Sequence, residues 1–375
     1  MKKYTVAVAG LGVRGKIHIH GLLENPERFE IVGLCDINAN AMQEVAEANG
    51  LQSVPQFTDV EEMLKTTKPE VFCFCLLPDQ RLNMIKLAVK YGVKGISLEK
   101  PVAESLQEAK EMVDLCKEHH IKAIVCHQQK YLSQFQRMKA RIDHGEIGTI
   151  RKIHVETTAW YSQLGTHYVD YILWINGGYK ARWVCGHVHG PICLDDTHPA
   201  PDYLMGTMEL ENGTRAYVEC GYLSERHNPT EYASSDNRLT VYGTDGYCYM
   251  ETDGFFGICS SETGGHLIEG KDPGWRYHQQ VPIQTPYYTE YADWLDDDTK
   301  IHSCNIETAY HGFEILEGMC LSALRNVRID LPIQDLSYTP VIEQMRAALP
   351  ACDSEKISLF LGHTIRKERE VDRYH

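Results

Sequence analysis

Two kinds of hydrophobic pattern divide the chain. From Tyr4 to about Val125, short runs of consecutive apolar residues such as TVAVAG and VFCFCLL alternate with stretches whose apolar positions recur every three to four residues. Continuous apolar strands separated by amphipathic helices are typical of a parallel sheet with helices on both faces. The pattern therefore predicts a doubly wound α/β domain over residues 1–126.

After His127 the period of the apolar positions changes to two. Alternating runs such as RKIHVETTAW and NRLTVYGTDGYCYMET are joined by turns at 211–213 and 244–246. This alternation is typical of antiparallel strands that have one face open to solvent. We expect an α+β second domain over 127–375 with a large, mostly antiparallel sheet. Because the open face needs a cover, we also expect a homo-oligomer, a dimer or a tetramer.

Further elements of the second half follow from local composition. Helical periodicity covers 132–144, 288–295 and 306–325, and the tail after residue 338 contains one or two more helices. Residues 262–286 are rich in Gly, Pro and His and have no clear period, so we expect a long surface loop there.

Composition and charge exclude several classes of function. Of the 375 residues, 43% are apolar and 24% are charged, as in ordinary soluble globular proteins, and the net charge is −15. An acidic surface repels nucleic acid and anionic lipid, so neither is expected as a partner. The longest apolar run, at 71–77, is far shorter than the ~20 residues of a membrane-spanning helix. The 13 cysteines form no CxxC pair, which favours reduced thiols in a cytoplasmic protein.

A glycine motif connects the first predicted strand to the first predicted helix. Gly10 provides a tight turn, Gly12 leaves room for a pyrophosphate, and Gly15 allows close helix packing. Asp36 ends the next strand, ~20 residues later, where a carboxylate accepts hydrogen bonds from the adenosine ribose and repels a 2′-phosphate. The pair predicts NAD(H) rather than NADP(H) as cofactor. The alternative is a strand-to-helix turn without a ligand.

A second motif, Glu99-Lys100-Pro101, ends the predicted strand GISL. In an open parallel sheet, ligands bind beyond the carboxyl ends of the strands, so a lysine there faces the nucleotide. The alternative is a surface lysine beside a turn proline.

Together these motifs resemble the Gfo/Idh/MocA oxidoreductases, the family of glucose-fructose oxidoreductase and inositol dehydrogenase. The resemblance extends in order through EIG at 146–148, GTHYVD at 165–170 and YGTDG at 242–246, to a helix that ends before Leu331. It implies that Lys100 and His167 lie against the nicotinamide and the substrate hydroxyl and act as the proton-transfer residues.

The resemblance also implies two sets of ligand-binding residues. Beside the positive nicotinamide and partly desolvated, Lys100 would have its neutral form favoured, as a base requires. Asp170 lies one turn after His167 and could orient it or the substrate. On the substrate side we expect Asp170, Gln163, Tyr161 and Lys130. On the cofactor side we expect Gly10, Gly12, Val13, Arg14, Gly15, Asp36, Leu77, Pro78, Glu99, Lys100 and Gln128.

Three positions differ from the family pattern. Many members have an acid where this chain has Gln163, which cannot act as a base. The histidine of the frequent T-P-x-x-x-H motif is replaced by Leu82, and an arginine often found after the first domain is replaced by Lys130. The cofactor side therefore matches the family, whereas the substrate side diverges.

The most specific expectation is an NAD-dependent oxidoreductase that acts on a secondary hydroxyl of a sugar, inositol or glycoside ring. Two alternatives remain: an enzyme that recycles a tightly bound NAD within one active site, and a catalytically silent nucleotide-sensing subunit. No metal is expected, because His187 and His189 with Asp195, Asp196 and His198 match no standard metal-ligand spacing.

Overall fold

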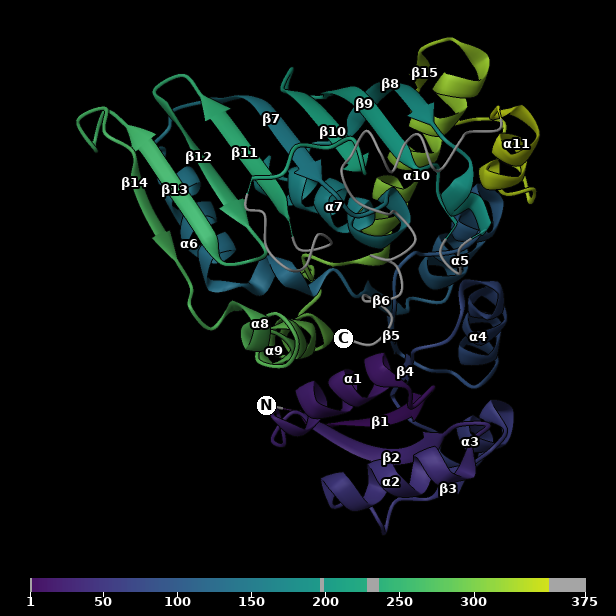
Figure 1. Ribbon diagram of the computed structural model, residues 1–375. Helices are drawn as coiled ribbons and strands as arrows, with labels where there is room; N and C mark the ends of the chain where they lie inside the picture. Colours follow the sequence, from purple (N-terminus) through teal and green to yellow (C-terminus); the bar gives the residue numbers. More distant parts are fainter. Residues whose placement is uncertain (1, 196–198, 228–235, 351–375) are drawn as a thin grey trace. The chain divides into compact units, whose positions relative to one another are not determined.

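The computed structural model describes residues 2–195, 199–227 and 236–350 (Figure 1). The chain forms two compact units. The first contains Met1–Tyr131 and Arg276–Tyr310, and the second contains Leu132–Trp275 and His311–His375. Among the described helices, none combines the length and hydrophobicity needed to span a bilayer.

The first unit is built on a six-stranded parallel sheet with the order β3-β2-β1-β4-β5-β6. This order reverses between β1 and β4, which is the point where doubly wound sheets bind nucleotides. The predicted doubly wound fold is confirmed. The strands are β1 (Tyr4–Ala9), β2 (Phe29–Cys35), β3 (Gln56–Phe57), β4 (Val71–Phe74), β5 (Gly95–Leu98) and β6 (Lys122–Val125).

Polar caps begin several helices of this unit. Asn38, Asp59 and Ser105 accept hydrogen bonds from backbone N–H groups in the first turns of α2, α3 and α5. The helices are α1 (Val13–Leu23), α2 (Ala39–Asn49), α3 (Val60–Thr67), α4 (Pro78–Lys90), α5 (Leu106–Glu118) and the 3₁₀ turn η1 (Gln128–Tyr131).

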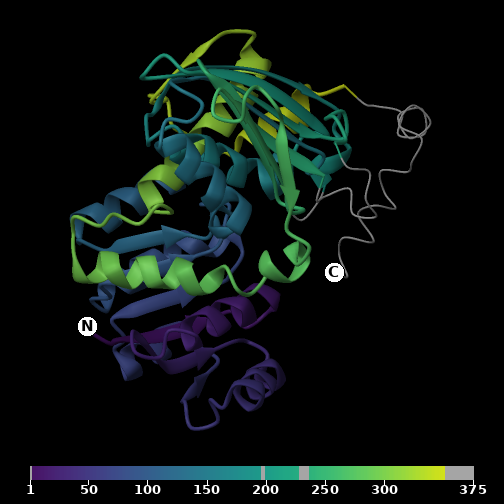
Figure 2. The same cartoon turned by 90° about the vertical axis from the view of Figure 1, so that its left-hand side faces the viewer.

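Helix α9 (Gln284–Asp296) returns to the first unit from far along the chain and lies beside α1 (Figure 2). Its buried Tyr288 and Tyr291 join the core around β1 and β2. A Cβ on Gly21 of α1 would lie 2.6 Å from the Cβ of Gln284, so only glycine permits this close contact. The change of period near residue 126 does not predict the return.

The second unit contains a nine-stranded sheet with the order β14-β13-β12-β11-β7-β10-β9-β8-β15. Every neighbouring pair is antiparallel except β7 with β10. The predicted large, mostly antiparallel sheet is confirmed. The strands are β7 (Ile150–Thr157), β8 (Ala181–His189), β9 (Tyr203–Leu210), β10 (Arg215–Gly221), β11 (Asn237–Gly243), β12 (Gly246–Glu251), β13 (Phe255–Ser260), β14 (Ile268–Lys271) and β15 (Ile329–Asp330).

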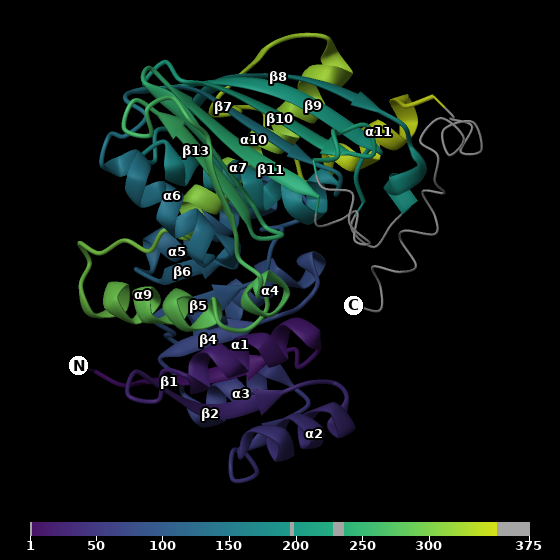
Figure 3. The ribbon, with the colours of Figure 1, turned by 60° about the vertical axis from the view of Figure 1, so that its left-hand side comes forward.

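Helices cover one face of this sheet (Figure 3). Gly186 of β8 and Gly206 of β9 have no side chain where Met319 of α10 packs against them. On the opposite face of β9 and β10, Met205 and Tyr217 are 45% and 41% exposed. The helical elements are α6 (Ser133–Asp143), the π-helical turn η2 (Tyr161–Gly165), α7 (Thr166–Ile175), the 3₁₀ turn η3 (Ile192–Asp195), α10 (Ile306–Arg325) and α11 (Val341–Ala348).

The expectation of a long loop over 262–286 was wrong. This stretch contains β14, the one-turn helix α8 (Trp275–His278) and the start of α9. Strand β14 pairs with β13, with Ile268 opposite Ile258. Elements of four residues are too short to show a period, and β14 is determined by its pairing with β13.

Candidate functional site

The glycine loop after β1 leaves space at the first turn of α1. Gly10 has φ +81°, and a Cβ there would lie 2.6 Å from the carbonyl oxygen of Cys75. A Cβ on Gly15 would lie 2.0 Å from the carbonyl oxygen of Gly10. By contrast, a Cβ on Gly12 would meet no atom within 4 Å. Free backbone N–H groups at a helix N-terminus with open space in front of them can hold a pyrophosphate.

Asp36 follows β2 and is anchored by two backbone donors. Its Oδ2 accepts from Leu11 N at 2.7 Å, and its Oδ1 accepts from Asn38 N at 2.9 Å. Each carboxylate oxygen keeps a lone pair, and the side chain is partly exposed. The carboxylate can therefore accept hydrogen bonds from two ribose hydroxyls.

Three exposed apolar side chains stand at the same edge of the parallel sheet. Val13, Ile37 and Leu77 follow β1, β2 and β4 and are 76%, 93% and 60% exposed. Pro78 follows at the start of α4. A flat heteroaromatic ring could pack against such side chains, since burying them is favourable.

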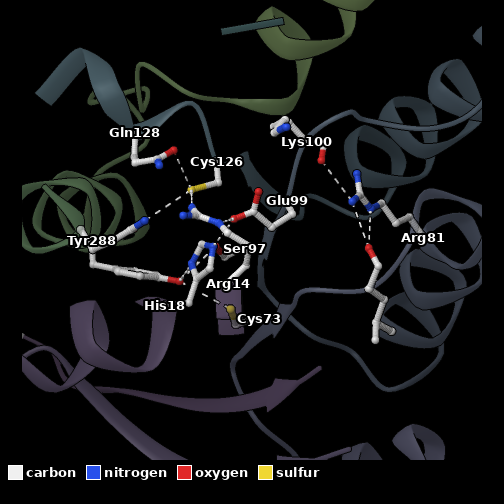
Figure 4. Close-up of polar contacts among 12 residues, drawn as sticks. Arg14, His18, Cys73, Arg81, Ser97, Glu99, Lys100, Cys126, Gln128 and Tyr288 are labelled. Carbon is white, nitrogen blue, oxygen red and sulfur yellow. Dashed lines mark hydrogen bonds and ion pairs between the residues drawn. The ribbon is translucent and has the colours of Figure 1, made fainter. Parts of the chain in front are cut away.

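Glu99, at the end of β5, is buried and accepts two charged donors. Arg14 Nε lies 2.6 Å and His18 Nε2 lies 3.1 Å from its Oε1 (Figure 4). Burial alone would raise the pKa of this carboxyl, but Arg14 and His18 outweigh burial and hold the pKa well below its usual range. Glu99 is therefore ionised.

The His18 ring connects this pair to α9. Its Nδ1 lies 2.6 Å from the hydroxyl of Tyr288, which also contacts Ser97 Oγ at 3.2 Å. On the other side, the amide of Gln128, in the orientation that satisfies both its atoms, accepts from Arg14 Nη2 and donates to the carbonyl of Cys126, each at 3.2 Å.

Lys100 follows Glu99 and is partly exposed. Among the described residues, none forms a hydrogen bond or an ion pair with its Nζ. Burial lowers the pKa of Lys100 to about 8; Glu99 opposes this shift, and Arg14 and Arg81 add to it. Near neutral pH the side chain can therefore exist as amine or as ammonium, so it can take or give a proton.

The second unit places three of the predicted substrate-side residues, and the predicted proton-transfer residue His167, on η2 and α7. His167 is buried, and its Nδ1 lies 3.1 Å from the hydroxyl of Tyr171. Asp170 is fully buried one turn later, and Gln163 is partly exposed. The hydroxyl of Tyr161 donates to Glu317 Oε1 at 3.1 Å.

Lys130 and the cofactor residues belong to the first unit. Lys130 is fully buried, and its Nζ donates to the carbonyl of Ser303 at 2.9 Å. Sequence analysis missed His18, Arg81 and Tyr288. For His18 a signal existed, because it lies four residues after Arg14 and so on the same face of α1.

Two groups of potential metal ligands occur in the described part of the chain. One consists of His18, Glu99 and Cys126, and the other of His154, Glu156 and Glu219. In the first group, Glu99 is already paired with the guanidinium of Arg14, whose charge would repel a cation. Of the acidic and histidine residues weighed as ligands from the sequence, Asp196 and His198 lie outside the described residues.

Comparison with known proteins identifies the family. Residues 4–127 match the family model of the NAD-binding Rossmann fold of the GFO/IDH/MocA oxidoreductases, and residues 135–249 match the model of the C-terminal domain of the same family. The chain belongs to the Gfo/Idh/MocA family. As a member of this oxidoreductase family, it has the family's NAD-binding domain; the open loop at Gly12 and the carboxylate of Asp36 fit that cofactor.

The curated relatives of this chain are distant in sequence. An uncharacterized oxidoreductase, YrbE of Bacillus subtilis, is 26% identical over 65% of this chain and 73% of its own length. The D-glucoside 3-dehydrogenase of Escherichia coli is 23% identical over 58% of this chain and 70% of its own length. Some matches are partial, since the D-apiose dehydrogenase of Paraburkholderia graminis is covered over 39% of its length, at 24% identity.

Solved structures share the fold with this family member. A levoglucosan dehydrogenase in complex with NADH and levoglucosan has a TM-score of 0.71 at 17% identity, over 88% of this chain and 100% of that one. The transcriptional regulator Gal80p of Kluyveromyces lactis has a TM-score of 0.73 at 16% identity, over 88% of this chain and 91% of that one. The fold alone therefore does not distinguish an enzyme from a regulator.

Proposed function

We propose that this protein interconverts a secondary hydroxyl and a ketone on a sugar, inositol or glycoside ring, with NAD as cofactor. The observation that carries the proposal is Lys100, an amine with a pKa of about 8 at the carboxyl end of β5. The D-glucoside 3-dehydrogenase and the levoglucosan dehydrogenase support a carbohydrate substrate, since their names describe that chemistry.

Lys100 is the proposed general base. When bound, NAD⁺ accepts the hydride of the carbinol carbon. The amine of Lys100 removes the hydroxyl proton as the C–H bond breaks and the carbonyl forms, and later releases this proton to solvent. In the reverse direction the ammonium of Lys100 donates the proton to the carbonyl oxygen.

The residues of η2 and α7 form the proposed substrate side. His167 is a second proton-transfer residue, and Asp170, one turn later on the same helix, orients either its ring or the substrate. Gln163 recognises a ring hydroxyl, because an amide both donates and accepts hydrogen bonds, and Tyr161, whose proton is donated to Glu317, accepts a hydrogen bond from another. Lys130 is a further proposed substrate-side residue. Its Nζ donates to the carbonyl of Ser303, so it would act by holding η1 in position.

A second candidate function is a nucleotide-binding regulator without catalysis. Two observations favour it: the similarity of fold to Gal80p, and Gln163 at the position where many family members carry an acid. Such a protein would bind NADH without producing a ketone.

The deciding experiment incubates the purified protein with NAD⁺ and a panel of sugars, inositols and glycosides. NADH absorbance and the mass of the keto product are followed together. A keto product with equal NADH supports the dehydrogenase, and a product without net NADH indicates that a bound NAD is recycled. The absence of product from every panel member, with NADH binding intact, would overturn the proposal and favour the regulator.

The proposed assembly is a cytoplasmic homo-oligomer formed through the open face of the nine-stranded sheet. Met205 and Tyr217 are exposed on that face. Light scattering at micromolar concentration tests this, and a monomer would contradict it.

A further inference from the structure

Arg81 joins the ends of two neighbouring strands. It lies in the first turn of α4 and is 3% exposed. Its Nε and Nη2 donate to the carbonyl of Leu76, at 3.1 and 3.0 Å, and Nη2 also donates to the carbonyl of Lys100 at 3.3 Å (Figure 4). Leu76 follows β4 and Lys100 follows β5, which pair in the sheet. One guanidinium therefore fixes the main chain at the carboxyl ends of both β4 and β5.

The charge of Arg81 is not balanced by an ion pair. Within the described ranges, no carboxylate lies within ion-pair distance of its guanidinium, and its Nη1 is buried without a hydrogen-bond partner. Glu99, the carboxylate whose charge acts most strongly on Arg81, is already bound by Arg14 and His18. Burial lowers the pKa of Arg81 to about 10, so the guanidinium remains charged at neutral pH.

We propose that Arg81 is a positioning residue for Lys100. Its guanidinium holds the main chain of Lys100 in place through a hydrogen bond to the carbonyl, and its positive charge favours the neutral amine of the Lys100 side chain. The inference rests on the proposed function, in which that amine is the general base. The sequence alone did not predict this role for Arg81.

Four groups act on the charge of Lys100, each from a different element. Glu99 at the end of β5 favours the ammonium, and so does Cys126 after β6. Arg14 on α1 and Arg81 on α4 oppose the ammonium, and so does burial. Arg14 is paired with Glu99, and the two act on Lys100 in opposite directions. Arg81 adds a positive charge that no ion pair within the described ranges balances, and its removal should raise the pKa of Lys100 toward 10.5.

The test measures the pKa of Lys100 directly, so it does not depend on a known substrate. The folded full-length protein is acetylated with trace acetic anhydride across a pH series, and acetylation of Lys100 is quantified by mass spectrometry against the exposed Lys94. Only the unprotonated amine reacts. In the wild type we expect the midpoint near pH 8, in agreement with the lowered pKa of Lys100.

Three variants separate charge from hydrogen bonding. Arg81→Gln keeps a donor for the Leu76 carbonyl but loses the charge, and should raise the midpoint by about one pH unit. Arg81→Lys keeps the charge and should leave the midpoint within a few tenths of a unit. Lys86→Gln removes an exposed charge from the same helix, where Lys86 pairs with Glu111, and should change nothing.

Two outcomes would overturn the role of Arg81: a midpoint that stays in place in Arg81→Gln, or one that rises equally in Arg81→Lys. If Arg81→Gln fails to fold, as judged by circular dichroism, Arg81→Met, which also loses the charge, takes its place with the same expected rise of the midpoint. Loss of activity in Lys100→Met tests the proposed function separately. A fully active Lys100→Met variant would refute the general base, whatever the midpoints in the Arg81 variants.

Discussion

Arg14 Nε lies 2.6 Å from Glu99 Oε1, so the glycine loop after β1 is tied to the residue that precedes Lys100. His18, on the same face of α1, adds a contact of 3.1 Å to the same oxygen. Because Glu99 is buried, these contacts are protected from water. One ionised carboxylate therefore couples the proposed pyrophosphate loop to the proposed base.

Replacing Glu99 with Gln should destabilise the first unit. Breaking a buried ion pair leaves an uncompensated charge and typically costs about 3–5 kcal/mol. The folded-state pKa of Glu99 is lowered. Its contribution to the free energy of unfolding is therefore fully present above pH 4.5 and is lost only as the pH falls toward that lowered pKa. Urea denaturation at pH 7 measures the loss in the free energy of unfolding.

The matched control is Glu61→Gln, which removes a partly exposed partner of Lys90. This variant should have the same urea midpoint as the wild type, because ion pairs near the surface contribute little to the free energy of unfolding. Equal midpoints for Glu99→Gln and the wild type would contradict the buried-pair argument.

Replacing Lys100 with Met should reduce oxidation of the substrate by at least about 100-fold, the usual contribution of a general base. NADH binding, followed by fluorescence, should persist. In the wild type, the rate of oxidation should rise with pH and level off above about 8, because the base must be deprotonated. Lys94→Met, at an exposed position, is the control and should retain the wild-type rate. A wild-type rate that falls as the pH rises from 6 to 8 would rule out a basic role.

The sequence predicted those parts of the site that are local in the chain. Gly12 and Asp36 follow consecutive strands, so a motif and a strand order suffice to place them. Tyr288 could not be predicted in this way, because only the packing of α9 against α1 brings its hydroxyl to His18. Arg81 was missed because its partners are backbone carbonyls, which leave no trace in side-chain patterns.

Replacing Asp36 with Asn should weaken NADH binding by about 10-fold and reduce the discrimination against NADPH. Hydrogen bonds to a charged group contribute about 1.5–3 kcal/mol, and the negative charge that repels a 2′-phosphate disappears. Titration of the protein fluorescence with each nucleotide gives both affinities. The control is Asp59→Asn, since Asp59 caps α3 through the N–H of Glu62. If Asp36→Asn still rejected NADPH as strongly as the wild type, the carboxylate would not set the cofactor preference.

Glu317 on α10 should make the second unit less stable as the pH rises. It is 3% exposed, and burial raises its pKa to about 7, although Tyr161 donates to it. The folded state therefore binds a proton that the unfolded state releases near 4.5, so stability falls between pH 4.5 and 7. Glu317→Gln stays neutral and accepts from Tyr161, so it should gain about 2–3 kcal/mol over the wild type at pH 8 and less than about 1 kcal/mol at pH 5. Urea denaturation at both pH values measures this, with the exposed Glu307→Gln on the same helix as control. A gain of the same size at both pH values would mean that packing, not ionisation, is the cause.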